Sequence, residues 1–183
     1  MRNTIILIAG MAGTGKTSFA KYLSSKLNIP LVCYDNIKAK EWDIIEKNEK
    51  LKELKLFGSF SYEYFWFFIE EIMKSSSLLI AEYFFHTINL TALNELVDKY
   101  NYKAVTVILD ADVEIAYNRF ITRNESKDRP EGLRGVCSFE DFEKCSEPNK
   151  AFRFGKNNIV VNTNDFNTVN YDEIIKDIIK FCS

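Results

Sequence analysis

The chain has 183 residues, of which 46% are hydrophobic and 27% charged, and these proportions are typical of a globular protein long enough to bury a core. Its net charge of -2 includes no basic excess, so the composition does not indicate a nucleic acid as partner. The four cysteines form no CxxC pair, which argues against a zinc site, and scattered thiols are typical of a reducing compartment. No apolar run is long enough for a membrane span, so we expect a cytoplasmic protein with a single domain over residues 1–183.

Short apolar runs alternate with stretches of helical periodicity along the whole chain. The expected strands cover residues 4–9, 31–34, 78–81, 104–109 and 158–161. The expected helices cover about 15–28, 37–55, 61–74, 88–100, 112–123, 139–149 and 170–181. This alternation predicts an α/β fold, in which right-handed crossovers place helices on both faces of a parallel sheet. Ligands of such sheets bind at the carboxyl ends of the strands.

The segment from Gly10 to Thr17, GMAGTGKT, fits the phosphate-loop pattern G-x-x-x-x-G-K-[ST] without a mismatch. Glycines let successive backbone N–H groups point at phosphate oxygens, and the following helix adds the positive end of its dipole. In this pattern Lys16 reaches the β- and γ-phosphates, and the Thr17 hydroxyl is a ligand of Mg²⁺. The motif therefore predicts ATP or GTP with Mg²⁺ as cofactors. The residues predicted to contact the nucleotide here are Gly10, Met11, Ala12, Gly13, Thr14, Gly15, Lys16, Thr17 and Ser18.

Three acidic residues end expected strands on the same edge as this loop. Glu82 and Asp110 are the candidates for the acid that orders Mg²⁺ through water. We favour Glu82, because Asp110 directly precedes a helix that it could cap. Asp35 ends the second expected strand, where a carboxylate can accept the proton of an attacking hydroxyl. Spacing alone explains Asp35 equally well as the cap of the next helix.

Arginines gather in the following part of the chain. Arg119 and Arg123 are four residues apart and share one helix face, and two more arginines follow in a polar loop at about 124–137. Guanidinium groups beside a phosphate site suit phosphoryl transfer, because they stabilise charge on the oxygens of the migrating group, and an arginine can also stack on a nucleobase. The loop fits a lid that closes over the substrate. A solvated helix face with surface ion pairs is the alternative.

Residues 60–68, with the sequence FSYEYFWFF, are unusually aromatic. A core helix with glutamates on its wet side explains this composition. Alternatively, this region between the second and third strands forms the wall of an acceptor site. In that case some of Tyr62, Tyr64, Trp66 and Phe67 pack an apolar or aromatic acceptor.

In motif order, over nearly its whole length, the chain resembles the P-loop small-molecule kinases, a group that includes chloramphenicol phosphotransferase, zeta-toxin-like kinases and polynucleotide kinase domains. The resemblance implies a three-layer P-loop fold with the five parallel strands in the order 2-3-1-4-5. It implies that Asp35 is the general base or acceptor-binding acid, and that Arg119 and Arg123 are the paired arginines of the lid. It also implies that the loop around Thr163 lies near the nucleotide base.

Together these residues predict an ATP-dependent phosphotransferase that moves the γ-phosphate to a hydroxyl of a small-molecule or nucleoside-like acceptor. Two departures from the family pattern motivate an alternative, a nucleotide-binding regulatory protein with little transfer activity. Glu82 stands in place of Asp, and Asn162 stands where Asp often precedes the threonine. A polynucleotide 5′-kinase is a further alternative, against which the net charge argues. The predicted catalytic residues are Lys16, Asp35, Arg119 and Arg123, and the predicted metal-binding residues are Thr17 and Glu82.

Overall fold

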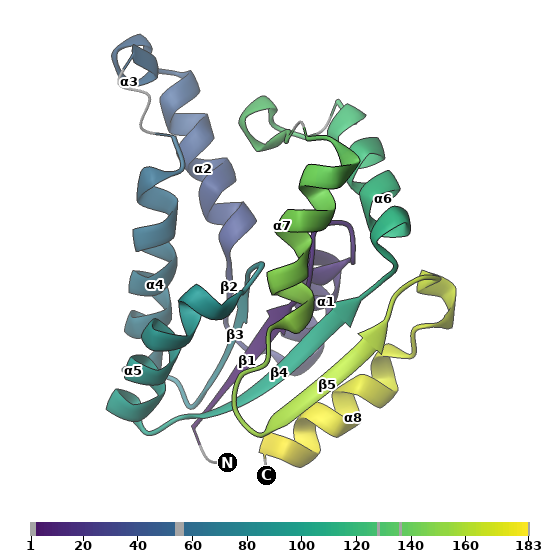
Figure 1. Ribbon diagram of the computed structural model, residues 1–183. Helices are drawn as coiled ribbons and strands as arrows, with labels where there is room; N and C mark the ends of the chain where they lie inside the picture. Colours follow the sequence, from purple (N-terminus) through teal and green to yellow (C-terminus); the bar gives the residue numbers. More distant parts are fainter. Residues whose placement is uncertain (1–2, 54–56, 128, 136, 183) are drawn as a thin grey trace.

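The computed structural model describes residues 3–53, 57–127, 129–135 and 137–182. Within these residues, five parallel strands form one sheet with helices on both faces (Figure 1). The strands lie in the order β2-β3-β1-β4-β5, so the predicted α/β fold and its strand order are confirmed. Their bounds are β1 Thr4–Ala9, β2 Leu31–Cys33, β3 Leu78–Glu82, β4 Lys103–Asp110 and β5 Asn157–Asn162.

The helices follow the predicted positions with one correction. The prediction of a single helix over 37–55 is wrong, because α2 begins directly after β2 and a second helix, α3, starts beyond Asn48. Positions 54 and 55 of that prediction lie outside the described residues. The Asn48 side chain accepts hydrogen bonds from the backbone N–H groups of Lys50 and Leu51, which starts a new helix instead of continuing the first. The α-helices are α1 Lys16–Leu27, α2 Tyr34–Glu46, α3 Glu49–Glu53, α4 Ser59–Met73, α5 Leu90–Tyr100, α6 Val113–Glu125, α7 Phe139–Ala151 and α8 Tyr171–Cys182. The short 3-10 helices in the described ranges are η1 Thr87–Asn89, η2 Glu131–Leu133 and η3 Phe166–Thr168.

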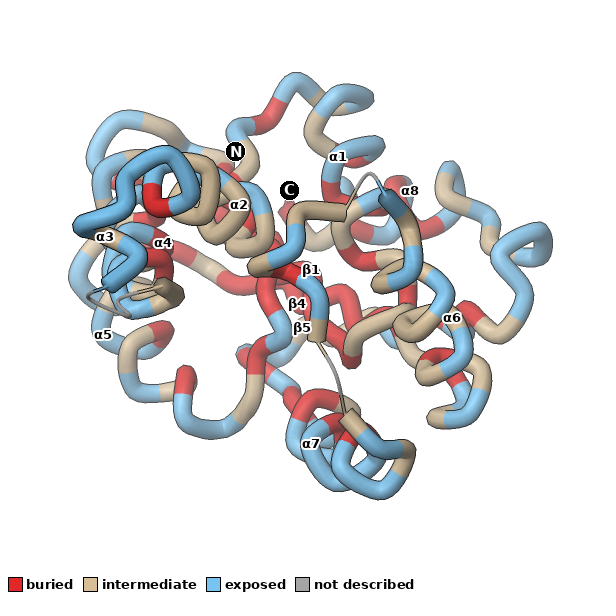
Figure 2. The backbone as a smooth tube through the Cα atoms, turned by 90° about the horizontal axis from the view of Figure 1, so that it is seen from above, coloured by how far each residue is buried: buried red, intermediate tan, exposed pale blue. Residues whose placement is uncertain are grey.

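The core consists of two apolar layers, one on each face of the sheet. Side chains of β1 alternate between them: Ile5 and Leu7 pack with α4 and α5, whereas Ile6 and Ile8 pack with α1 and α8. Since both faces are covered, all six residues of β1 are buried, which explains its continuous apolar sequence. Figure 2 shows this burial along the strands in the middle of the molecule, with exposed residues on the surrounding helices.

The carboxyl ends of the strands meet at one edge of the sheet, because all strand pairs are parallel. The phosphate loop follows β1, and Glu82 and Asp110 are the last residues of β3 and β4. Asp35 lies in the first turn of α2, directly after β2. The predicted site residues therefore start from the same edge. Over the described ranges, no helix has the length and apolar character needed to cross a bilayer.

Candidate active site

The phosphate loop has the closed conformation that its glycines allow. Gly13 and Gly15 have φ values of +80° and +84°, in the left-handed region that favours glycine. A Cβ on Gly13 would lie 2.2 Å from the Ala116 carbonyl oxygen, so the loop approaches α6 too closely for a side chain. The Thr14 hydroxyl and the Lys16 ammonium group donate to the Met11 carbonyl at 2.9 and 2.8 Å. The loop thus curls around the lysine side chain and leads directly into the N-terminus of α1, an arrangement that binds phosphate.

A buried carboxylate lies beside this lysine. Glu82 is only 3% exposed, and it accepts a hydrogen bond from the Cys33 thiol at 2.9 Å and another from the Thr17 hydroxyl. Burial raises the pKa of Glu82, although the positive charge of Lys16 opposes this change. Burial also lowers the pKa of Lys16, and the charges of Glu82 and Asp35 oppose it. Bound phosphates would add negative charge beside Lys16 and favour its protonated form.

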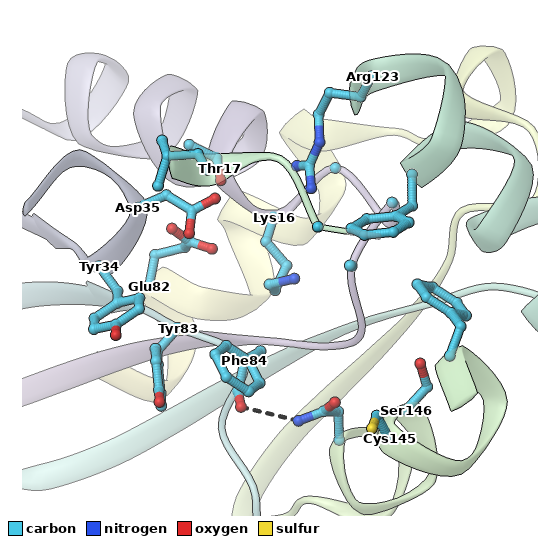
Figure 3. Close-up of a pocket in the computed structure, with 18 of the residues that line it drawn as sticks. Lys16, Thr17, Tyr34, Asp35, Glu82, Tyr83, Phe84, Arg123, Cys145 and Ser146 are labelled. Atoms are coloured by element: carbon cyan, nitrogen blue, oxygen red, sulfur yellow. Dashed lines mark hydrogen bonds between the residues drawn. The ribbon is translucent and has the colours of Figure 1, made fainter. Parts of the chain in front are cut away.

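One cavity, of about 370 Å³, brings most of the predicted site residues together (Figure 3). Asp35 and Glu82 lie on one side of Lys16, and Arg123 reaches over the phosphate loop from α6. The predicted site residues that line this cavity are Ala12, Gly13, Gly15, Lys16, Thr17, Ser18, Asp35, Glu82 and Arg123. Gly10, Met11 and Thr14 shape the loop from behind, since the Met11 carbonyl accepts both hydrogen bonds described above.

The residues around Thr17 fit a magnesium ion. Mg²⁺ takes oxygen ligands, usually one or two from carboxylates, and it keeps several waters and substrate phosphates as the others. The hydroxyl of Thr17 and the carboxylates of Asp35 and Glu82 all face the cavity beside the loop. Asp110 does not line the cavity, and its carboxylate lies 3.9 Å from the Lys150 ammonium group instead. Of these two acids, Glu82 is therefore the one that lines the cavity beside Thr17.

Arg119 and Thr163 lie outside the lining of this cavity. The Arg119 guanidinium donates to the carbonyls of Thr163 and Asn164, each at 2.7 Å, and lies 4.0 Å from the centre of the Phe166 ring. The hydroxyl of Thr163 donates to the Asp110 carbonyl at 2.9 Å, so this side chain ties the loop after β5 to the end of β4. Because the Phe166 ring packs against Gly15, the loop that Arg119 holds also supports the phosphate loop.

Two other guanidinium groups face the cavity. Arg123 and Arg129 both line it, and the Arg123 Nε atom is buried with no hydrogen-bond partner in the described part of the chain. Burial lowers the pKa of Arg129, and the nearby charge of Arg123 lowers it further. Two cations in partial burial repel each other, so an anion between them would be stabilised. The sequence indicated both arginines as candidates, but only the structure shows that they line the cavity and that Arg119 does not.

The predicted lid at about 124–137 contacts α2 on the other side of the cavity. Gly132 in η2 packs against the Trp42 ring, where an added Cβ would lie 2.1 Å from a ring carbon. The Asn124 side chain donates to the Gly135 carbonyl at 2.7 Å, which joins the two ends of the loop. Residues 128 and 136 of the predicted lid lie outside the described residues. Of the described residues of this loop, Arg129, Leu133 and Gly135 line the cavity.

Comparison with known proteins agrees with this geometry. A family model described as an AAA domain matches residues 6–144. The chain belongs to this AAA domain family. A comparison with curated proteins finds no match.

Solved structures with the same fold match this AAA domain protein over nearly its whole length. It is similar to a candidate kinase from Chloroflexus aurantiacus, with 18% identity, a TM-score of 0.82 and 98% of each chain covered. A gluconokinase from Sinorhizobium meliloti has 12% identity and a TM-score of 0.55, with 100% of this chain and 93% of the other covered. A shikimate kinase from Bacteroides thetaiotaomicron has 16% identity and a TM-score of 0.54, with 97% of each chain covered. The predicted resemblance to P-loop small-molecule kinases is confirmed in the fold, and the AAA domain match includes the phosphate loop.

Two parts of the cavity lining in this AAA domain protein were not predicted from the sequence. Helix α7 was predicted, but its contribution of Cys145 and Ser146 to the lining was not. The aromatic residues proposed for the acceptor wall, Tyr62, Tyr64, Trp66 and Phe67, do not line the cavity. The aromatic lining on this side is instead Tyr34, the first residue of α2, together with Tyr83 and Phe84, which directly follow β3. An aromatic residue directly after a strand that ends at the phosphate-loop edge was the signal that could have found them.

Proposed function

We propose that this protein is a P-loop phosphotransferase that moves the γ-phosphate of ATP or GTP, bound with Mg²⁺, to a hydroxyl of a small-molecule or nucleoside-like acceptor. The observation that carries the proposal is the cavity itself, which combines the phosphate loop with the carboxylates of Asp35 and Glu82 and with the guanidinium groups of Arg123 and Arg129. The described kinases of gluconate and shikimate share this fold, which supports a small-molecule acceptor. All four cysteines are free thiols, which supports the predicted cytoplasmic location.

The phosphate end of the cavity would hold the nucleotide. Lys16 and the loop amides bind the β- and γ-phosphates, and Thr17 with Glu82 would hold Mg²⁺, which supplies positive charge to the phosphates when bound. Arg123 and Arg129 stabilise the charge on the equatorial oxygens of the migrating group. We assign Arg119, with the loop around Thr163, to the side of the nucleotide base.

Asp35 would handle the proton of the acceptor. The acceptor oxygen forms a bond to the γ-phosphorus as the bond from this phosphorus to the β–γ bridging oxygen breaks. The hydroxyl proton passes to the Asp35 carboxylate, and the nucleoside diphosphate leaves. The position of Asp35 beside Lys16 and Glu82, in the first turn of α2, supports this role.

The substitution Asp35→Asn tests the proposal. We expect it to lower kcat by about a hundredfold or more, as loss of a general base does, while nucleotide affinity changes by less than about twofold. Asp43→Asn is the matched control, because Asp43 lies on the same helix and does not line the cavity. Turnover and nucleotide affinity are measured by product release and calorimetry. Unchanged turnover in Asp35→Asn would remove this residue from the mechanism.

A further inference from the structure

The cavity has an aromatic end that the phosphate chemistry does not use. Figure 3 shows Tyr34, Tyr83 and Phe84 together on one side, next to Asp35, with α7 opposite. The ring centroids of Tyr34 and Tyr83 are 4.6 Å apart, and those of Tyr83 and Phe84 are 4.4 Å apart. Phe84 as a residue remains 43% exposed although it lines the cavity. The structure thus presents an aromatic surface beside Asp35, the predicted general base.

This surface is held in place from behind. The Tyr83 ring packs on the buried rings of Phe65 and Phe85, with centroid distances of 5.3 and 5.4 Å. The Asn149 side chain of α7 donates to the carbonyls of Phe84 and Phe85 at 2.9 and 3.1 Å, and the first of these bonds is drawn in Figure 3. A surface fixed in this way loses little conformational entropy when a ligand covers it.

The charges at this end disfavour an anionic acceptor. In Figure 3 the carboxylates of Asp35 and Glu82 lie together beside Lys16, so an acceptor carboxylate that approached Asp35 would face two carboxylates. Lys38, also in the lining, places its ammonium group 5.2 Å from the centre of the Phe57 ring, which does not line the cavity. The cations Arg123 and Arg129 lie at the phosphate end.

The face of an aromatic ring suits a flat ring better than it suits the hydroxyls of a polyol. A hydroxyl that is pressed against the face of an aromatic ring loses water without gaining a hydrogen bond, and this costs free energy. The face of this aromatic surface offers stacking to a flat ring instead.

We propose that the acceptor is an uncharged alcohol with a flat aromatic or heteroaromatic ring, which stacks on Phe84 beside Tyr34 and Tyr83 and presents its hydroxyl to Asp35. This inference rests on the proposed phosphotransferase activity, and it names the chemical class of the acceptor for that same site. The transfer itself is the step given above, with the acceptor oxygen replacing the bridging oxygen at the γ-phosphorus.

The first test compares three sets of acceptors: nucleosides with phenyl-bearing alcohols, neutral sugars and polyols, and sugar acids. The full chain is assayed with Mg²⁺ and ATP or GTP, and release of nucleoside diphosphate is measured. We expect kcat/KM for the ring-bearing set to exceed that of the other sets by about tenfold or more. Preference for polyols or sugar acids would overturn the inference and leave the proposed phosphotransferase standing.

The second test removes the stacking surface. We expect Phe84→Ala to raise KM for ring-bearing acceptors about tenfold and to leave nucleotide affinity unchanged. Phe67→Ala is the matched control, because Phe67 is a 52% exposed residue of α4 that does not line the cavity, and it should change neither value. Phe84→Leu, which keeps the apolar bulk without the ring, separates stacking from folding. An unchanged KM in Phe84→Ala would overturn the inference.

A binding measurement separates the two proposals if no acceptor is turned over. That outcome would contradict the proposed activity. Saturation-transfer NMR with the same nucleosides and phenyl-bearing alcohols would then decide the aromatic subsite. Binding that is lost in Phe84→Ala and kept in Phe67→Ala would support the subsite, and no binding to the unmodified chain would overturn it.

Discussion

Arg119 offers a quantitative test of how the nucleotide side of the site is held. Its guanidinium donates to two backbone carbonyls that lie 44 and 45 residues further along the chain, and it stacks on Phe166. Hydrogen bonds from a charged donor contribute about 1.5–3 kcal/mol each, and an exposed cation–π contact about 0.5–1 kcal/mol. Since Arg119 is only half-buried, we expect Arg119→Ala to lower the free energy of unfolding by about 2–4 kcal/mol.

The assay is denaturant unfolding of paired variants, together with nucleotide affinity. Arg119→Lys should recover less than half of the loss, because an ammonium group cannot reproduce the planar fork that spans two carbonyls. Arg153→Ala is the matched control: Arg153 also donates to two carbonyls, but these belong to Lys150 and Phe152, which are already close in the chain. We expect a smaller loss there and unchanged nucleotide affinity. If Arg119→Ala unfolds at the same denaturant concentration as the unmodified chain, the reasoning is refuted.

Two further predictions concern the phosphate loop and the thiols. Gly13→Ala should abolish nucleotide binding and destabilise the fold by more than Gly58→Ala does. Both glycines have positive φ, but of the two only Gly13 has an atom, the Ala116 oxygen, 2.2 Å from the new Cβ. Equal losses of stability in the two variants would contradict this prediction. With a thiol reagent at about pH 8, exposed Cys145 should react quickly and Cys33 should not, because burial raises the Cys33 pKa and its thiolate forms only at higher pH. Mass spectrometry locates the label, and fast labelling of Cys33 would argue against its buried bond to Glu82.

Much of the fold was predictable because its signals are local. A continuous apolar run ending in GMAGTGKT predicts a buried strand and a phosphate loop without knowledge of any distant residue. The break between α2 and α3 was missed, although its cause is also local, because the preference of Asn48 for capping competes with a helical pattern that continues on both sides.

The remaining features of the site depend on contacts between distant segments. Arg119 and Arg123 share a helix face, yet one bonds to the loop after β5 and the other faces the cavity, and spacing cannot distinguish them. Asn149 fixes Phe84 across 65 residues, so no sequence pattern places α7 against this surface. Tyr34 and Tyr83 meet because β2 pairs with β3, a neighbour relation that the resemblance to kinases implied but no single motif contains.

The central claim is tested most directly by the release of nucleoside diphosphate from ATP or GTP by the purified full chain with Mg²⁺, with and without pooled hydroxyl acceptors. The account predicts release that depends on the acceptor, is lost in Lys16→Ala, and is accompanied by a phosphorylated acceptor. Tight nucleotide binding with no release in any pool would contradict it and would favour a nucleotide-binding regulatory protein.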